Sequence, residues 1–225
     1  MAKRWAIEDK VYDTDLREII THSNLVFADA AARDAFLVGD LAPVPGMLTY
    51  LVAADNLSNT QRRIRVGGVD YWAPPTGMEV VGMSPAASVS AATGVATQVV
   101  NMTNVRGRNA NTMWANNQFT PSVPGFYELD AAVRFNNASA ADGYRLAWLS
   151  LNGASQVTAI PGSGNQLGPG AANPSTVHTR TVSLYFNGID GSYVTLMCMH
   201  NSASSITISG LATSATLFTA KYLGM

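Results

Sequence analysis

The feature that most constrains the fold is a strict alternation of apolar and polar side chains in the middle of the chain. From Tyr127 to Phe135, apolar residues occupy every second position. This period of two is typical of a β-strand that buries one face and exposes the other. A helix would instead repeat its apolar positions every three or four residues. We therefore expect a half-buried strand here, in an antiparallel sheet.

The rest of the second half of the chain predicts more strands of the same kind. Further strand-like segments are expected at 144–151, 156–160, 176–186, 192–200, 205–208 and 213–223. Turn-forming pairs such as Asn152-Gly153 and Asn187-Gly188 separate them, and no helical pattern intervenes. About eight short strands without helices predict an antiparallel β-sandwich over residues 96–225, most simply a jelly roll.

The first 79 residues read differently, as a small α+β module. Residues 16–20 begin a short helical pattern. Asp29 is a suitable N-cap for a helix over residues 30–37, and it is spaced to pair with Arg33. Strands are expected at 47–52, 62–66 and 69–72, with Gly67-Gly68 as the hairpin turn between the last two. The whole chain is thus expected to be mainly β.

Charge is distributed unevenly along the chain. Residues 1–79 carry 8 Lys/Arg and 11 Asp/Glu, whereas residues 80–225 carry only 6 and 4. This change predicts a domain boundary, and we expect the Ala-, Ser- and Thr-rich residues 80–95 to be a linker. A surface with so few charges repels itself weakly, so we expect it to face copies of itself. The alternative is a monomer with an uncharged polar surface.

Several classes of function are disfavoured. The net charge of -1 argues against a nucleic-acid binder, and no apolar run approaches the roughly 20 residues of a membrane span. The N-terminal residues do not resemble a secretory signal. The three histidines, His22, His178 and His200, lack metal-ligand spacing. We expect Cys198 to be a buried hydrophobe, His200 and Trp148 to be interior residues, and no cofactor to bind.

Two carboxylates, Glu128 and Asp130, fall on one face of the central strand, as the acid pair of a glycosidase would. We interpret them as ordinary exposed acids, and we expect no catalytic residue anywhere in the chain. The one basic cluster is formed by Arg62, Arg63 and Arg65. It either docks on an acidic neighbour or is a solvated strand face balanced by Asp55 and Asp70.

Contacts with a neutral glycan are expected from uncharged residues. Asn165 and Gln166 lie in the Gly- and Pro-rich segment 162–170, which we expect to be a long exposed connector. Trp114 lies among several asparagines and is a candidate for stacking on a sugar. The alternative for each is a role in packing or in the loop alone.

The N-terminal module carries a resemblance to a known family. The segments Asp29 to Ala35, Pro43 to Leu51 and Trp72 to Pro74 resemble the N-terminal modules of minor tail proteins of actinobacterial phages. Residues 56–61 depart from that pattern, because this link is longer and more polar here. The resemblance implies a docking module in a virion.

The second half carries another resemblance. The spacing of Phe119, Gly125, Tyr127 and Leu129 is similar to the signature strand of the complement globular-head and tumour-necrosis-factor-like jelly rolls, which prefer an aromatic at the last position. Residues 215–225 are similar to the closing strand of that family. This resemblance implies a homotrimer with the terminal strand at its interface, where we expect Leu217, Phe218 and Tyr222.

These expectations favour a structural virion protein of a bacteriophage: a minor tail protein whose trimeric head faces outward and contacts a host surface glycan. Its partners would be copies of itself, other phage structural proteins and that glycan. One alternative is a capsid decoration or head-fibre protein of the same build. Another is a glycan-binding module without a structural role.

Overall fold

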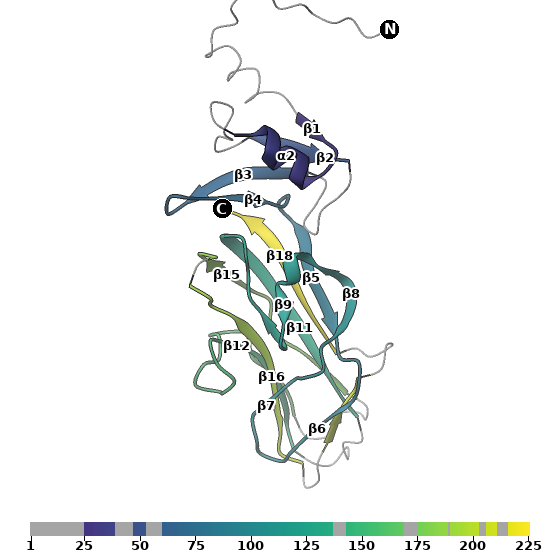
Figure 1. Cartoon of the computed structure of the whole chain (residues 1–225). Helices are drawn as coiled ribbons and strands as arrows, with labels where there is room; N and C mark the ends of the chain where they lie inside the picture. The colour runs from purple at the N-terminus through teal and green to yellow at the C-terminus, as the bar shows by residue number, and fades with distance from the viewer. Residues whose placement is uncertain are drawn as a thin grey trace, which may run out of the picture. The chain divides into compact units, whose positions relative to one another are not determined.

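The computed structural model describes residues 25–38, 47–52, 60–136, 143–168, 175–188, 190–202, 206–210 and 216–225. The chain divides into two compact units, Met1–Pro75 and Thr76–Met225, which are treated separately below (Figure 1). The helical pattern over 16–20, His22 and Asp55 lie outside the described residues. None of the helices in the described ranges is both long and apolar enough to span a bilayer.

The first unit is a four-stranded sheet with one short helix. The sheet has the order β1-β2-β3-β4, in which β1 and β2 are parallel and the other neighbours antiparallel. Its elements are β1 (Leu25–Phe27), α2 (Ala30–Phe36), β2 (Leu48–Leu51), β3 (Thr60–Val66) and β4 (Val69–Ala73). Gly67 and Gly68 both have positive φ and make the tight β3–β4 turn, as the sequence predicts.

The helix begins where the sequence indicates. The Asp29 side chain accepts a hydrogen bond of 2.8 Å from the backbone N–H of Ala32, so it caps the first turn of α2. The expected Asp29–Arg33 pair is not formed, because this carboxylate is engaged by the helix end. Arg33 is instead buried: it bonds to Asp34 at 2.8 Å and to Gln61 at 2.5 Å, and its guanidinium lies 4.1 Å from the ring centre of Trp72.

The second unit is an antiparallel β-sandwich of two sheets. The eight-stranded sheet has the order β6-β17-β11-β18-β5-β8, with β14 and β15 pairing with the free side of β11. Figure 1 shows β11 and β18 side by side in this sheet. Its strands are β5 (Met78–Ser84), β6 (Val89–Ala91), β8 (Asn104–Asn109), β11 (Gly125–Asn136), β14 (Ser175–His178), β15 (Val182–Phe186), β17 (Ile206–Ile208) and β18 (Leu217–Gly224).

The opposing sheet has six strands in the order β13-β12-β16-β10-β9, with β7 pairing with β16. Its strands are β7 (Thr97–Gln98), β9 (Trp114–Ala115), β10 (Gln118–Phe119), β12 (Arg145–Leu151), β13 (Asn165–Leu167) and β16 (Val194–His200). A 3-10 turn, η2 (Ala110–Thr112), leads from β8 to β9. The expected fold class, mainly β with an antiparallel sandwich, is therefore confirmed.

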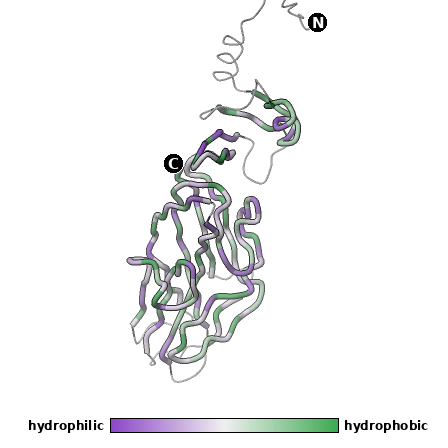
Figure 2. Tube along the Cα trace, turned by 60° about the vertical axis from the view of Figure 1, so that its left-hand side comes forward, coloured by the Kyte–Doolittle hydropathy of each residue, from purple (hydrophilic) through white to green (hydrophobic). Residues whose placement is uncertain are grey.

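An aromatic cluster fills the space between the two sheets. The ring of Phe119 lies 5.4 Å from that of Tyr127, 6.0 Å from Phe186 and 5.7 Å from Phe218, measured between centroids. The hydroxyl of Tyr127 donates to the carbonyl of Val123 at 2.6 Å, and burial raises its pKa above the ordinary range. Figure 2 shows apolar and polar residues alternating along the strands, as expected for the strand from Tyr127 to Phe135.

Two expected strands are corrected by the structure. Residues 156–160 do not form a strand; they loop back and touch β12 through a single bridge between Ser150 and Ala159. The expected strand over 176–186 is two strands, β14 and β15, which both pair with β11. Thr179 lies between them, where its backbone N–H donates to the carbonyl of Ala131 at 2.8 Å.

The expected linker over 80–95 is also wrong. Its first residues belong to β5, which pairs with β18 on one side and β8 on the other, and residues 89–91 form β6. Val80, Val81 and Ala91 are fully buried. Small side chains here serve close packing in the sandwich rather than flexibility. The boundary between the units falls earlier, after Pro75.

Candidate functional site

The candidate site is the face of the eight-stranded sheet that points away from the six-stranded sheet, here called the outer face. Alternate residues of β11 and β18 reach it, while the intervening ones, such as Leu129 and Ala220, are buried in the core. The outer-face residues of these two strands include Phe126, Glu128, Asp130, Leu217, Thr219 and Lys221.

This alternation corrects two of the residues expected at a trimer interface. Phe218 is fully buried within its own protomer, where its ring lies 4.7 Å from that of Trp114. Tyr222 is also buried, and its hydroxyl donates to the carbonyl of Pro124 at 3.2 Å. Neither side chain is available to a second copy. Leu217 is half-buried and lies on the outer face, so it is the one of the three residues whose side chain a second copy could reach.

Two aromatic side chains stand on the outer face where β11 meets β15. The rings of Phe126 and Tyr185 lie 5.3 Å apart, and each side chain is 46% exposed. We call them the aromatic pair. Sequence reasoning did not single them out. The available signal is that each directly precedes a core aromatic, Tyr127 or Phe186, and therefore points to the opposite side of its strand.

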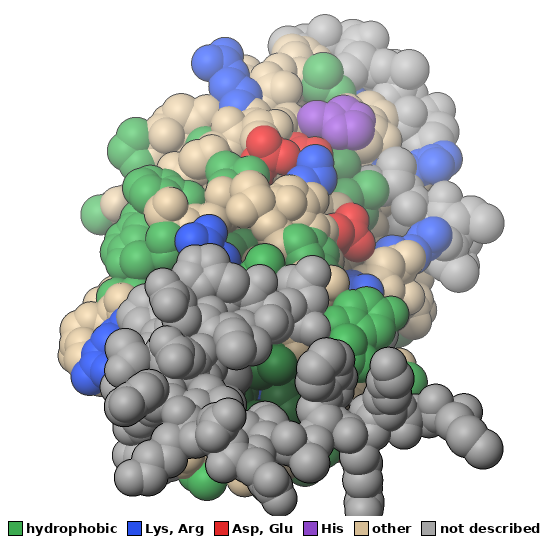
Figure 3. All heavy atoms as spheres, turned by 90° about the horizontal axis from the view of Figure 1, so that it is seen from above, with side chains coloured by type: hydrophobic (Ala, Val, Ile, Leu, Met, Phe, Trp, Pro, Cys, Tyr) green, Lys and Arg blue, Asp and Glu red, His purple; other side chains and the backbone are tan. Residues whose placement is uncertain are grey.

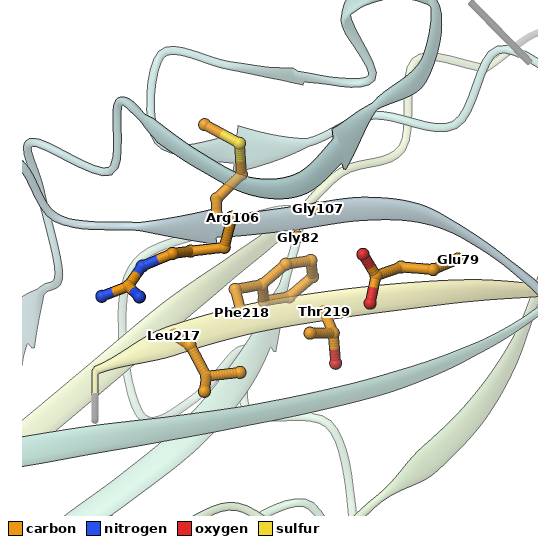
Figure 4. Close-up of a pocket in the computed structure, with 8 residues that line it drawn as sticks. Glu79, Gly82, Arg106, Gly107, Leu217, Phe218 and Thr219 are labelled. Atoms are coloured by element: carbon orange, nitrogen blue, oxygen red, sulfur yellow. The ribbon is translucent and has the colours of Figure 1, made fainter. Parts of the chain in front are cut away.

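A hollow of about 230 Å³ lies elsewhere on the same face, over β18, β5 and β8. Gly82 and Gly107 form part of it, and we call it the glycine hollow. A Cβ atom on Gly82 would meet the Glu79 carboxylate at 2.8 Å, so the absence of a side chain makes room for that group. Figure 4 shows Glu79 at one end of the hollow and Arg106 at the other.

Charges near this face are few and dispersed. Lys221 and Glu128 form an ion pair of 3.1 Å in which both side chains are partly exposed, and such surface pairs contribute little to stability. Arg106 donates to the hydroxyl of Ser84 at 2.9 Å. On the side of the molecule that is seen from above, charged side chains are scattered among uncharged and apolar ones (Figure 3). Glu128 is thus an ion-paired surface residue.

The basic cluster lies in the first unit, where Asp70 balances two of its three members. Arg63 bonds to Asp70 at 3.1 Å and Arg65 approaches the same carboxylate at 3.8 Å. Arg63 also lies 5.2 Å from the ring centre of Trp72. Arg62 is exposed, opposite Leu48 in the strand register, and is the member of the cluster that keeps its charge available.

The residues expected to contact a glycan do not share one place. Trp114 is only 4% exposed, and its indole N–H donates to the carbonyl of Met102 at 2.9 Å, so it is a core residue and not a stacking platform. Asn165 and Gln166 lie in strand β13, which pairs with β12, rather than in a free loop. Gln166 is exposed, while the Asn165 side chain accepts from the backbone N–H of Gln166 at 2.9 Å.

The expected interior residues are confirmed. Cys198 and His200 are fully buried, and Trp148 nearly so. Burial raises the pKa of the Cys198 thiol to about 12. His200 accepts a hydrogen bond at Nδ1 from the backbone N–H of Ser202, so its Nε2 carries the proton that points to the carbonyl of Ala91 at 2.8 Å. Among the described residues, no group of three His, Cys, Asp or Glu side chains is placed to hold a metal ion.

Comparisons with known proteins return structures only. No family model and no curated protein sequence matches this chain. Similar solved structures include murine APRIL at pH 5.0, with 15% identity and a TM-score of 0.43, covering 64% of this chain and 98% of that chain. They also include Eiger TNF from S. frugiperda, with 8% identity and a TM-score of 0.42, covering 65% of this chain and 94% of that chain.

Proposed function

We propose that this protein is a non-enzymatic structural protein of a bacteriophage virion that assembles through the outer face of its second unit. In this proposal three copies form a ring, as the resemblance of the sequence around Phe119 to Leu129 implies. The first unit docks the ring on the virion, and exposed Arg62 contributes a positive charge to that contact. Loops of the second unit are then presented to the host.

The observation that carries this proposal is the layout of the outer face. The aromatic pair lies at β15 and β11, and the glycine hollow lies at β18, β5 and β8. Strands β15 and β8 are four strand spacings apart, which is about 19 Å. A projection and a hollow at separate places on one face allow a contact between unlike surfaces of two copies. Such a contact closes a ring where the rotation from one copy to the next divides a full turn, and the proposal is that it does so after three copies.

The energetic reason to expect assembly is the exposed apolar surface of the aromatic pair. Half-exposed Phe126 and Tyr185 each carry a large apolar surface, and burying it against a second copy is favourable at roughly 25 cal/mol per Å². Charges on this face are few, and the pairing of Glu128 with Lys221 lowers the cost of desolvating these two without removing it. The outer face is therefore suited to self-association.

The test is the mass of the full chain in solution. We expect sedimentation velocity at micromolar concentration to give a trimer, and Tyr185→Asp to shift it to monomer, because a carboxylate would be buried unpaired. Val157→Asp is the matched control: Val157 is 96% exposed in a loop, so the same substitution there should leave the trimer intact. A monomeric wild-type chain would contradict the proposal.

The proposal that the protein belongs to a virion rests on the sequence of the first unit. Its position within the virion has two alternatives, the tail and the capsid, which antibody labelling distinguishes. Antibody labelling of intact particles should decorate the tail if this is a minor tail protein. Labelling over the capsid surface would instead favour the decoration or head-fibre alternative. Particles that contain the protein in neither place would refute a virion role altogether.

A further inference from the structure

We propose that a second hollow, at the edge of the sandwich beside β8 and β9, is a binding site for a neutral carbohydrate. It has a volume of about 400 Å³, within the range of small-ligand sites. It shares only Met83 with the glycine hollow. We call it the asparagine hollow, after Asn101, Asn109, Asn116 and Asn117 in its lining.

The lining determines the class of ligand. None of the residues around the asparagine hollow carries a charge. The amides of Asn101 and Asn116 and the hydroxyl of Thr103 supply donors and acceptors side by side, which is what the hydroxyl groups of a sugar require. Val105, an exposed residue of the lining, provides apolar surface for the C–H face of a sugar ring. An anionic or cationic ligand would lose its hydration here without gaining a counter-charge.

Two of the asparagines fix the walls. The Asn109 side chain accepts from the backbone N–H of Trp114 at 2.8 Å and donates to its carbonyl at 2.9 Å. The Asn117 side chain accepts from the backbone N–H of Met102 at 3.0 Å. The indole of Trp114 in turn donates to Met102, so the two sides of the hollow are tied together. A site held in this way is preorganised for its ligand.

The other two asparagines are left for a ligand. Asn101 and Asn116 are exposed, and within the described part of the chain their side-chain amides make no hydrogen bond. Both have left-handed backbone, with φ of 58° and 52°. Glycine satisfies such a conformation at least as well as asparagine does. The backbone therefore does not require amide groups at these positions, whereas a polar ligand does.

Backbone strain is concentrated around the same hollow. Five of the six non-glycine residues with positive φ in the described chain fall between positions 101 and 117. Three of the five, Asn101, Asn116 and Asn117, line the hollow, and the other two lie in η2. Strained backbone of this kind persists where surrounding contacts hold it, and it often accompanies binding sites.

This inference rests on the host-contact part of the proposed function, and the test separates the two. The full chain is titrated with neutral oligosaccharides of glucose, galactose, mannose and arabinose, and with an oligomer of galacturonic acid, while the indole N–H signal of Trp114 is followed by NMR. We expect binding of at least one neutral oligosaccharide in the millimolar range, a shift of the Trp114 signal, and none with the uronic acid.

The double variant Asn101→Gly with Asn116→Gly keeps the left-handed backbone and removes both amides, so affinity should fall at least tenfold. Asn111→Gly, at an exposed left-handed position outside the lining of the hollow, is the matched control and should bind normally. Ala115→Trp, at an exposed position of the lining, fills the hollow and should abolish binding without affecting the fold.

Absence of binding to every neutral probe, preference for the uronic acid, or undiminished binding by both hollow variants would overturn the carbohydrate site. Each sample is also sedimented. An intact trimer that binds no sugar refutes this site alone, whereas a wild-type monomer that binds sugar refutes the assembly proposal alone.

Discussion

Replacing Phe119 with alanine tests the account of the core. Phe119 is fully buried in the two-residue strand β10, and three aromatic rings lie within 6.0 Å of its own. Because Tyr127 and Phe218 belong to the eight-stranded sheet, this side chain joins the two layers of the sandwich. Its loss leaves a cavity that rigid neighbouring rings cannot close.

The expected cost follows from burial. Truncating a buried phenylalanine to alanine typically lowers the free energy of unfolding by about 3–5 kcal/mol, and close packing against rings places Phe119→Ala at the upper end. Domains of this size are stable by only about 5–15 kcal/mol, so the second unit should become marginal. Phe126→Ala removes the same side chain from the outer face and should cost the protomer less than about 1.5 kcal/mol.

The assay is urea unfolding of the full chain, followed by circular dichroism at several protein concentrations so that assembly and protomer stability are separated. We expect Phe119→Ala to lower the midpoint strongly at every concentration. Phe126→Ala should weaken assembly rather than the protomer. Its unfolding midpoint should therefore fall mainly at high protein concentration, and the midpoint should depend less on protein concentration than in the wild type. Equal losses for the two variants, or a loss below about 1 kcal/mol for Phe119→Ala, would refute the assignment of core and outer face.

Three further outcomes are expected. Burial raises the pKa of Cys198 to about 12 from an ordinary value of 9.0, so the thiol should react with a disulfide reagent at pH 8 only after the protein unfolds. For the same reason the free energy of unfolding should fall as pH rises from about 9 toward 12, and rapid labelling of the native chain would contradict this account. Asp29→Ala removes the cap of α2 and should cost the first unit about 1 kcal/mol in thermal unfolding, with Asp29→Asn as the conservative control that retains most of it. Gly125→Ala should destabilise the second unit in the same assay, because a Cβ at this position would meet the Tyr222 ring at 2.5 Å and φ is 148°. Gly168→Ala is the control, since a Cβ there meets nothing within 4 Å, and equal stability of the two variants would contradict the reasoning.

Local patterns in the sequence predict those structural features that are determined by residues close together along the chain. The alternation from Tyr127 to Phe135, the Asp29 cap and the Gly67-Gly68 turn all appear as expected, because period, capping and turn chemistry act over a few residues. Cys198 and His200 are buried as expected, but so are six of the seven residues of β16, so their burial reflects a strand covered on both faces rather than an alternation.

Features that depend on strand pairing are harder to predict. Residues 80–95 have the composition of a linker, yet pairing of β5 with β18 and β8 makes them part of the sheet. The faces of β18 could have been read correctly, since polar Thr219 and Lys221 alternate with the buried side chains. The asparagine hollow brings together residues from β5, β8 and the turn after β9. No local pattern in the sequence predicts that these residues lie close together.

The most direct test of the central claim joins the two halves of the proposed contact covalently. Tyr185→Cys with Arg106→Cys places one thiol at the aromatic pair and one at the glycine hollow, and Cys198 is too buried to interfere. Within one chain the two positions are separated by at least the four strand spacings of about 19 Å, far beyond the roughly 7 Å that a disulfide spans. Mild oxidation of the full chain should therefore give covalent dimers and trimers on a non-reducing gel, with nothing larger, and neither single variant should cross-link. A chain that stays monomeric, a ladder that continues past the trimer, or dimers from either single variant would contradict a closed ring built through the outer face.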